Sequence, residues 1–173
     1  QLAAYGMPVR LFEMRPTRTS PAHHTDRFAE LVCSNSLKGT DPSSATGTLK
    51  RELDALGSLL LGIAHQTHVP AGAALAVDRE AFSGRVTDAL TDDPLVEVIR
   101  EEVTALPPAG EVVLAVGPLA TPGIERALSS LVGSERLAFY DAAAPIVDAE
   151  SIDTSVAFAA SRYDKGESAD YLN

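Results

Sequence analysis

Tryptophan is missing from this chain, cysteine occurs once, and aromatic side chains make up only 5% of its 173 residues. A single cysteine excludes a disulfide within the chain, which fits a reducing, cytoplasmic environment. No apolar run approaches the ~20 residues that a membrane-spanning helix needs. The first thirty residues lack the ordered basic, apolar and small-residue regions of a secretory signal. We therefore expect a cytoplasmic protein without a membrane partner.

Basic residues are also scarce, with 14 Lys and Arg against 24 Asp and Glu and a net charge of −10. The deficit lies in one part of the chain, because residues 1–70 hold 7 basic against 6 acidic side chains and residues 71–173 hold 7 against 18. Nucleic-acid binding usually leaves a basic footprint. If RNA is a partner, we expect its contacts within residues 1–70 or in sequence outside this chain.

What is present is an alternation of helical and extended patterns, which is typical of an α/β fold. Strands are predicted at residues 7–13, 95–103 and 112–116, the last as a continuous apolar run typical of a strand buried on both faces. Residues 69–77 are predicted to form a small-residue strand or a tight connection. Residues 14–47 are predicted to form a long polar loop with a short helix at 25–32. A loop of that length is usually functional or disordered, and function is favoured here by apolar residues suited to burial, namely Phe28, Leu31, Val32 and Leu37.

Three helices follow from apolar spacing and capping signals. The first, at residues 48–66, is capped by Thr46 or Thr48 and carries one apolar stripe formed by Leu49, Leu53, Leu56, Leu60 and Ile63. The second is capped by Asp78 and buries Phe82, Val86 and Leu90. The third starts at Thr121 and Pro122, buries Ile124, Ala127, Leu128 and Leu131, and ends at Gly133.

Both ends of the chain look cut. Residues 1–6 resemble the last turns of a helix that ends on Gly6, so we expect a strand and most of a helix upstream. After Leu137 the chain becomes apolar and then acidic, with Tyr163 and Tyr171 and no clear helix. We predict one domain over residues 1–137 and the start of a second over 138–173.

Glu13 is the first candidate for a binding role, because it ends the first predicted strand. In doubly wound sheets, an acid at the carboxyl end of an early parallel strand accepts hydrogen bonds from the ribose of a bound adenine dinucleotide. The alternative is a solvated acid at a strand end. The Gly-x-Gly-x-x-Gly loop that would decide between the two is not present in this chain.

Cys33 is the candidate reactive group. It lies near Lys38, Arg27, His23 and His24 in the sequence, and cationic neighbours favour a thiolate. The alternative is that the side chain packs in the core. The two histidines and Cys33 lack the spacing and the fourth ligand of a zinc site, so we expect no metal.

Weaker signals lie elsewhere. Arg79 follows Asp78 and is suited either to a cofactor phosphate or to the surface of a helix. Gly117 follows the apolar run 112–116, as glycines do where a backbone approaches a flavin closely. Tyr163 and Tyr171 are suited to stacking on bases or to ordinary packing.

Several of these segments together resemble the TrmFO family of folate- and FAD-dependent tRNA uracil-5 methyltransferases. The resemblance is carried by Arg-Leu-Phe-Glu-Met-Arg-Pro (10–16), Thr-Asp-Arg-Phe-Ala-Glu-Leu-Val-Cys-Ser-Asn-Ser-Leu (25–37), Val-Pro-Ala-Gly-Ala-Ala-Leu-Ala-Val-Asp-Arg-Glu (69–80), Ala-Val-Gly-Pro-Leu (115–119) and Ser-Ala-Asp-Tyr-Leu-Asn (168–173). The GidA-type wobble-uridine flavoproteins share the nucleotide-binding core but look less similar over residues 25–37.

The resemblance implies a glutathione-reductase-like FAD-binding domain of Rossmann type, interrupted by an insertion domain that begins near residue 138. It implies that NAD(P)H reduces FAD and that 5,10-methylenetetrahydrofolate donates a one-carbon unit to C5 of a T-loop uridine in tRNA. Cys33 corresponds to a family cysteine beside the flavin, as nucleophile, flavin adduct or proton acceptor. The cofactor-binding residues implied are Glu13, Met14, Arg15, Ser34, Asn35, Val103, whose backbone would meet adenine, and Gly117.

The resemblance also places the family's glycine-rich loop before residue 1 and its second reactive cysteine after Asn173. We therefore expect the isolated chain to bind FAD poorly and to be inactive. Val116 departs from the family pattern, since many flavoproteins carry Thr there. The alternatives are a GidA-like modifier of wobble uridine and a non-catalytic α/β binding module in which Cys33 is packing.

Overall fold

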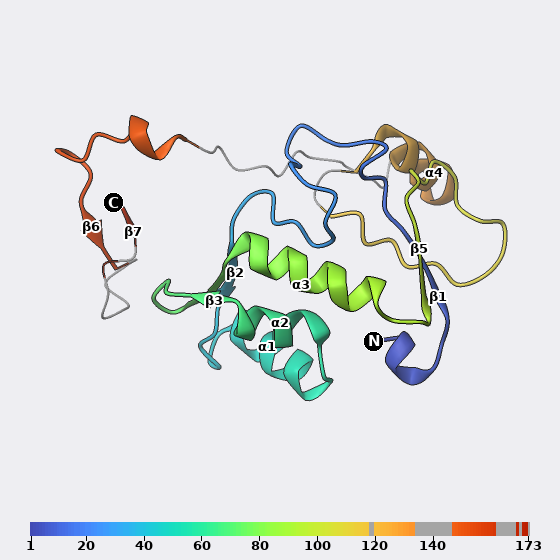
Figure 1. Ribbon diagram of the computed structural model, residues 1–173, viewed down its shortest axis with the longest axis horizontal. Coiled ribbons are helices and arrows are strands. Elements are labelled where there is room, and N and C mark those ends of the chain that lie inside the picture. Colours follow the sequence, from blue (N-terminus) through green and yellow to red (C-terminus); the bar gives the residue numbers. More distant parts are fainter. Residues whose placement is uncertain (118–119, 134–146, 162–168, 170, 173) are drawn as a thin grey trace.

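The computed structural model describes residues 1–117, 120–133, 147–161, 169 and 171–172 (Figure 1). A 3₁₀ turn (η1, Ala3–Tyr5) precedes β1 (Val9–Phe12), β2 (Ser36–Gly39), α1 (Ala45–Ala55), α2 (Leu59–Gln66), β3 (His68–Val69), β4 (Ala74–Val77), α3 (Arg79–Thr91), β5 (Val96–Ile99), α4 (Pro122–Val132), a second 3₁₀ turn (η3, Ala149–Ser151), β6 (Ala159–Ala160) and β7 (Tyr171–Leu172). The fold is mixed α/β, with parallel and antiparallel strand pairs.

Strands β1 and β5 form a parallel pair, at the right of Figure 1, in which Val9 lies opposite Val96 and Phe12 opposite Ile99. The ladder continues one residue past β1, because the amide of Glu13 donates to the carbonyl of Ile99 at 2.9 Å. The strands predicted at residues 7–13 and 95–103 are confirmed, although β5 is shorter than its prediction. Two strands far apart in the sequence therefore end side by side, as expected of an α/β sheet.

The second sheet is antiparallel, with β4 between β2 and β3. The predicted strand at 69–77 thus forms β3, a turn and β4, whereas β2 lies in the segment that we predicted to be loop. The helix predicted at residues 25–32 is wrong. Ala29 has a left-handed φ of 53°, which interrupts a helix, and the amide of Phe28 donates to Thr87 Oγ1 on α3 at 2.9 Å.

The single helix predicted at 48–66 is two helices, because the chain turns at Gly57. This glycine has a φ of 68°, a conformation that other residues adopt only with strain. Ser58 then caps α2, and Ser44 caps α1 in place of the predicted Thr46 or Thr48.

The prediction of one buried apolar stripe along residues 48–66 is also wrong. Leu49, Leu56 and Leu60 are exposed, because two separate helices no longer share the face that one continuous helix would have had. Ile63 is buried as predicted, while Leu53 is only partly buried against the core.

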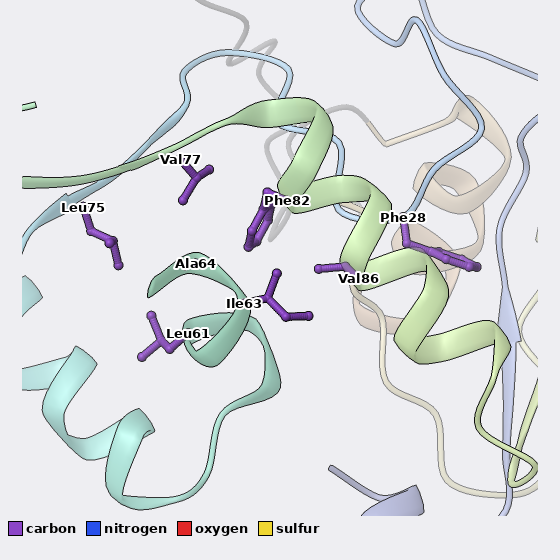
Figure 2. Close-up of a cluster of buried hydrophobic side chains, with 8 residues drawn as sticks. All are labelled: Phe28, Leu61, Ile63, Ala64, Leu75, Val77, Phe82 and Val86. Atoms are coloured by element: carbon purple, nitrogen blue, oxygen red, sulfur yellow. The ribbon is translucent and has the colours of Figure 1, made fainter. Parts of the chain in front are cut away.

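Helix α3 lies between the two sheets in Figure 1, and its inner face is the centre of the core. Asp78 caps it by accepting a hydrogen bond from the amide of Ala81, as predicted. Phe82 and Val86 are each 2% exposed, and Leu90 packs at the edge of the cluster. The cluster shown in Figure 2 comprises Phe28, Leu61, Ile63, Ala64, Leu75, Val77, Phe82 and Val86.

The strand predicted at residues 112–116 is wrong. These residues have no regular secondary structure, and Val113 is 82% exposed. A strand buried on both faces needs a neighbouring strand, and the part of the chain described here pairs β1 with β5 alone in the parallel sheet.

Helix α4 follows its capping signals, since Thr121 accepts a hydrogen bond from the amide of Ile124 and Gly133 ends the helix. Ile124 is buried, Ala127 and Leu128 are half-buried, and Leu131 is exposed contrary to prediction. The boundary predicted near residue 137 lies outside the described residues, as does Tyr163. Beyond it, β6 and β7 form an antiparallel pair. None of the helices described is both long and apolar enough for a membrane span.

Candidate functional site

Two charged residues, Glu13 and Arg100, lie at the same edge of the parallel strand pair. Glu13 follows β1 directly and Arg100 follows β5 directly. Because the strands are parallel, both side chains start from the carboxyl edge, which is where open α/β sheets bind their ligands. The strand-end position predicted for Glu13 is therefore the observed one.

The carboxylate of Glu13 is held by Arg15, two residues along the chain. Glu13 Oε1 accepts from the Arg15 amide at 3.0 Å and from Nε at 2.9 Å, and Oε2 accepts from Nη2 at 2.9 Å. This two-pronged pairing fixes the plane of the carboxylate. The Arg15 side chain is 6% exposed and that of Glu13 is 16% exposed, so the pair is largely removed from water.

The other end of the Arg15 guanidinium meets Glu30. Arg15 Nη1 donates to Glu30 Oε2 at 2.7 Å and to the carbonyl of Thr25 at 3.1 Å. Glu30 in turn accepts from the amide of His24 at 2.9 Å and from the amide and hydroxyl of Thr25 at 3.2 and 3.1 Å. One arginine between two carboxylates thus organises the polar loop that follows β1.

Arg100 fastens this loop to β5. Its Nη1 donates to the carbonyl oxygens of Arg15 at 3.2 Å and Asp26 at 2.6 Å. Thr17 Oγ1 donates to the carbonyl of Arg100, and Arg18 pairs with Glu102. The loop after β1 is therefore anchored to the residues after β5 at several points.

Charge at this edge is tuned by the same contacts. Burial raises the pKa of Glu13, but hydrogen bonds from Arg15 and the charges of Arg15 and Arg100 outweigh it, so the pKa lies below its usual value. Burial also raises the pKa of Glu30, but hydrogen bonds from His24 and Thr25 and the charge of Arg15 outweigh it, so this pKa too lies below its usual value. The hydrogen bond to Glu13 raises the pKa of Arg15. All three groups stay charged at neutral pH.

His23 adds a neutral group beside them. Burial lowers its pKa, and the neighbouring positive charge of Arg15 lowers it further, so the imidazole is neutral at pH 7. Its Nδ1 lies 2.6 Å from Ser20 Oγ, and the tautomer of the neutral ring sets which of the two atoms donates the hydrogen bond. Among the residues that the structure describes, no group of three or more His, Cys, Asp or Glu is arranged to hold a metal.

Cys33 is exposed, so the interpretation of this side chain as core packing is wrong. The residues after it are fixed to the antiparallel sheet. Asn35 Nδ2 donates to the carbonyl of Val77 at 3.1 Å, and the amide of Val77 donates to the carbonyl of Asn35 at 3.0 Å. Ser34 Oγ accepts from the amide of Ser36 at 3.1 Å. The thiol therefore stands in solvent on an anchored segment.

The other predicted cofactor residues follow β1 or β5 in the sequence. Met14 is half-buried between Glu13 and Arg15, and its carbonyl accepts from the amide of Arg18 at 2.8 Å. Val103 is half-buried four residues after β5 ends. Gly117 has a φ of 72°, which favours glycine, although residues 112–116 directly before it do not form the predicted strand.

Sequence reasoning missed Glu30 and Arg100. Arg100 had a usable signal, because it follows a predicted strand just as Glu13 does. Glu30 had none, since its role depends on Arg15 being brought against it across 15 positions of the sequence.

Comparison with known proteins gives one family and several close relatives. The sequence model of the Glucose inhibited division protein A family matches residues 1–173. The chain is 57% identical to a protein of Desulfitobacterium hafniense named methylenetetrahydrofolate-tRNA-(uracil-5-)-methyltransferase TrmFO, over 100% of this chain and 39% of that protein. Proteins of the same name from Heliobacterium modesticaldum and Thermus thermophilus are 55% and 56% identical, over 100% and 99% of this chain and 39% and 38% of their own lengths. The chain thus spans about two fifths of the length of these relatives.

Proposed function

The chain belongs to the Glucose inhibited division protein A family, and on that basis we propose that it is part of an FAD- and folate-dependent tRNA uracil-5 methyltransferase. The observation that carries the proposal is the place of Glu13, an oriented carboxylate at the carboxyl edge of a parallel strand pair. The relatives that are 52 to 57% identical carry the name of this activity.

The residues at this edge fit the adenosine half of FAD. A carboxylate oxygen has two lone-pair sites, and Glu13 Oε2 accepts one hydrogen bond from Arg15, so one site is left for a ribose hydroxyl. The lowered pKa of Glu13 keeps it an acceptor at neutral pH. In this proposal Met14 and Arg15 flank the adenosine, the backbone at Val103 meets adenine, and Ser34, Asn35 and Gly117 lie along the rest of the cofactor.

Cys33 supplies the reactive thiol in this proposal, and its exposure supports that role. Uracil C5 is a weak nucleophile, and a thiolate that adds at C6 leaves an electron pair at C5 for attack on a one-carbon unit. Loss of the C5 proton then expels the thiolate and restores the ring. Bound FAD, reduced by NAD(P)H, would supply the electrons that convert the one-carbon unit from methylenetetrahydrofolate into a methyl group.

The proposal is tested in the full-length protein with two substitutions. Cys33→Ala should abolish methyl transfer to a tRNA transcript while flavin absorbance stays with the protein. Glu13→Ala should weaken FAD binding. Unchanged turnover of Cys33→Ala would remove the thiol from the reaction, and unchanged FAD affinity of Glu13→Ala would remove the ribose role.

A second candidate, modification of a wobble uridine, is kept because the matching family model carries the GidA name. Both candidates use the same nucleotide-binding residues, so they differ in the position of the uridine. Mapping of the modified base in tRNA from a deletion strain separates them: loss at C5 of the T-loop uridine supports the first candidate, and loss at the wobble position supports the second.

A further inference from the structure

We propose that Glu30 is a positioning residue for FAD, which sets the affinity for the adenosine half by holding Arg15 and, through it, the carboxylate of Glu13. This inference rests on the proposed function, since it takes Glu13 as the ribose-binding group. Glu30 itself does not touch the cofactor in this proposal. Its effect passes through one guanidinium that contacts both carboxylates.

Glu30 has little capacity left for a ligand. Its Oε2 accepts three hydrogen bonds, from Arg15 Nη1 and from the amide and hydroxyl of Thr25. Its Oε1 accepts from the amide of His24. The side chain is 12% exposed, and its negative charge lies against the Nη1 end of Arg15. Glu30 is therefore tied to the loop and to Arg15.

Arg15 transmits the restraint because its guanidinium is planar and rigid. Nη1 is fixed by Glu30 and the carbonyl of Thr25, while Nε and Nη2 hold the two oxygens of Glu13. Restraint at both ends prevents rotation of the guanidinium plane, and the plane of the Glu13 carboxylate follows. An accurately oriented acceptor is what a bound ribose needs, because a misaligned hydrogen bond weakens steeply.

Neutralising Glu30 should loosen this arrangement without leaving a buried charge unpaired. In Glu30→Gln the Arg15–Glu13 pair remains, so the two opposite charges still compensate each other. At the position of Oε2, the new amide nitrogen would face the donors of both Arg15 and Thr25, and at the position of Oε1 it would face the amide of His24. In the first orientation the guanidinium loses its hydrogen bond to residue 30. In the second it keeps a bond to a neutral oxygen, which holds it less strongly than a carboxylate, and the amide of His24 loses its acceptor.

The test is a titration of FAD into the full-length apoprotein, comparing the wild type with Glu30→Gln, Glu13→Ala and the double variant. Glu30→Gln should bind FAD about tenfold more weakly, a loss of about 1.4 kcal/mol. Because Glu30 acts through Glu13, the double variant should match Glu13→Ala within about twofold. The matched control is Glu97→Gln, which removes an exposed carboxylate on β5 that pairs with Arg10 and should leave FAD affinity unchanged.

Two smaller probes separate positioning from general loss of structure. ADP-ribose, which carries the adenosine half, should lose affinity for Glu30→Gln by the same factor as FAD. FMN, which lacks that half, should change by less than about twofold. Equal losses for ADP-ribose and FMN would show a general structural defect and overturn the inference.

The outcomes for FAD distinguish the two proposals. If Glu13→Ala weakens binding and Glu30→Gln does not, or if their effects add in the double variant, the inference about Glu30 is wrong and the proposed function stands. If Glu13→Ala leaves binding unchanged, the ribose role fails and the inference fails with it. If Glu30→Gln unfolds on purification, the same titrations are carried out with Glu30→Asp. This variant keeps the negative charge but shortens the reach to Arg15. The same outcomes then support or overturn the inference about Glu30.

Discussion

The guanidinium carbon of Arg100 lies 4.6 Å from the centroid of the Phe28 ring, which joins the polar edge of the parallel strand pair to the hydrophobic core. Phe28 belongs to the core cluster that is shown around α3 in Figure 2. The same guanidinium donates to the carbonyl oxygens of Arg15 and Asp26. A single side chain thus couples the loop that carries Arg15 to β5 and to the core.

Replacing Arg100 by Met should therefore lower the free energy of unfolding by about 2 kcal/mol, from lost hydrogen bonds to a charged group and a lost cation–π contact. The measurement is urea denaturation of the 173-residue chain. Arg10→Met is the matched control, because Arg10 also lies over a ring, that of Phe12 at 5.3 Å, and pairs with Glu97, but is largely exposed. It should cost less than about 1 kcal/mol. Equal losses in the two variants would show that Arg100 has no special part in anchoring the loop.

Gly47 in α1 should not tolerate alanine. A Cβ at this position would lie 1.9 Å from the carbonyl oxygen of Asp41, a backbone atom that cannot move without the loop before α1. Alanine normally stabilises a helix relative to glycine by up to about 1 kcal/mol, so Gly62→Ala in α2, where nothing lies within 4 Å, should be neutral or stabilising. Gly47→Ala should instead lose about 2 kcal/mol or more. Thermal melts of both variants measure the contrast, and a stabilised Gly47→Ala would mean that the loop does not pack there.

The stability of the chain should depend on pH through Glu13 and Glu30. Both pKa values lie below the usual 4.5, because the hydrogen bonds and positive charge that each carboxylate receives outweigh its burial. A lowered pKa stabilises the fold at pH values above 4.5, and that stabilisation is lost as the pH falls through the folded-state pKa.

Urea denaturation between about pH 3 and pH 7 should therefore show a decline in the wild type that is shallower in the Glu13→Gln/Glu30→Gln double variant. Glu97→Gln serves as the control for removal of a carboxylate, because this side chain is 67% exposed. A decline of the same steepness in the double variant would mean that other groups carry the acid sensitivity.

Two valines test where the hydrophobic core ends. Val86 is 2% exposed on α3, whereas Val113 is 82% exposed in the segment that the sequence predicted to be a buried strand. Val86→Ala should lose about 2 kcal/mol of unfolding free energy, and Val113→Ala should change it by less than about 0.5 kcal/mol. A large loss of unfolding free energy from Val113→Ala would instead support the prediction that residues 112–116 form a buried strand.

Capping signals and strand ends were readable because they depend on neighbours within a few residues. Asp78 and Thr121 each cap the helix that follows them, with bonds to amides three residues along. Glu13 ends a strand because an apolar run stops there, and the parallel pairing follows from the alternation of strands and helices. The same signals put Glu13 among the candidate site residues.

Only the tertiary structure decided which apolar runs became buried and which charged residues paired with each other. The leucines of α1 and α2 have the spacing of a single buried stripe, yet the turn at Gly57 leaves Leu56 exposed. The apolar run at residues 112–116 reads as a strand, but a strand forms only against another strand. Arg15 and Glu30 are 15 positions apart, and Arg100 is 85 from Arg15. Local sequence specifies the turn, cap or strand end at a residue, whereas the partner of a charge or a strand is fixed only when the whole chain has folded around it.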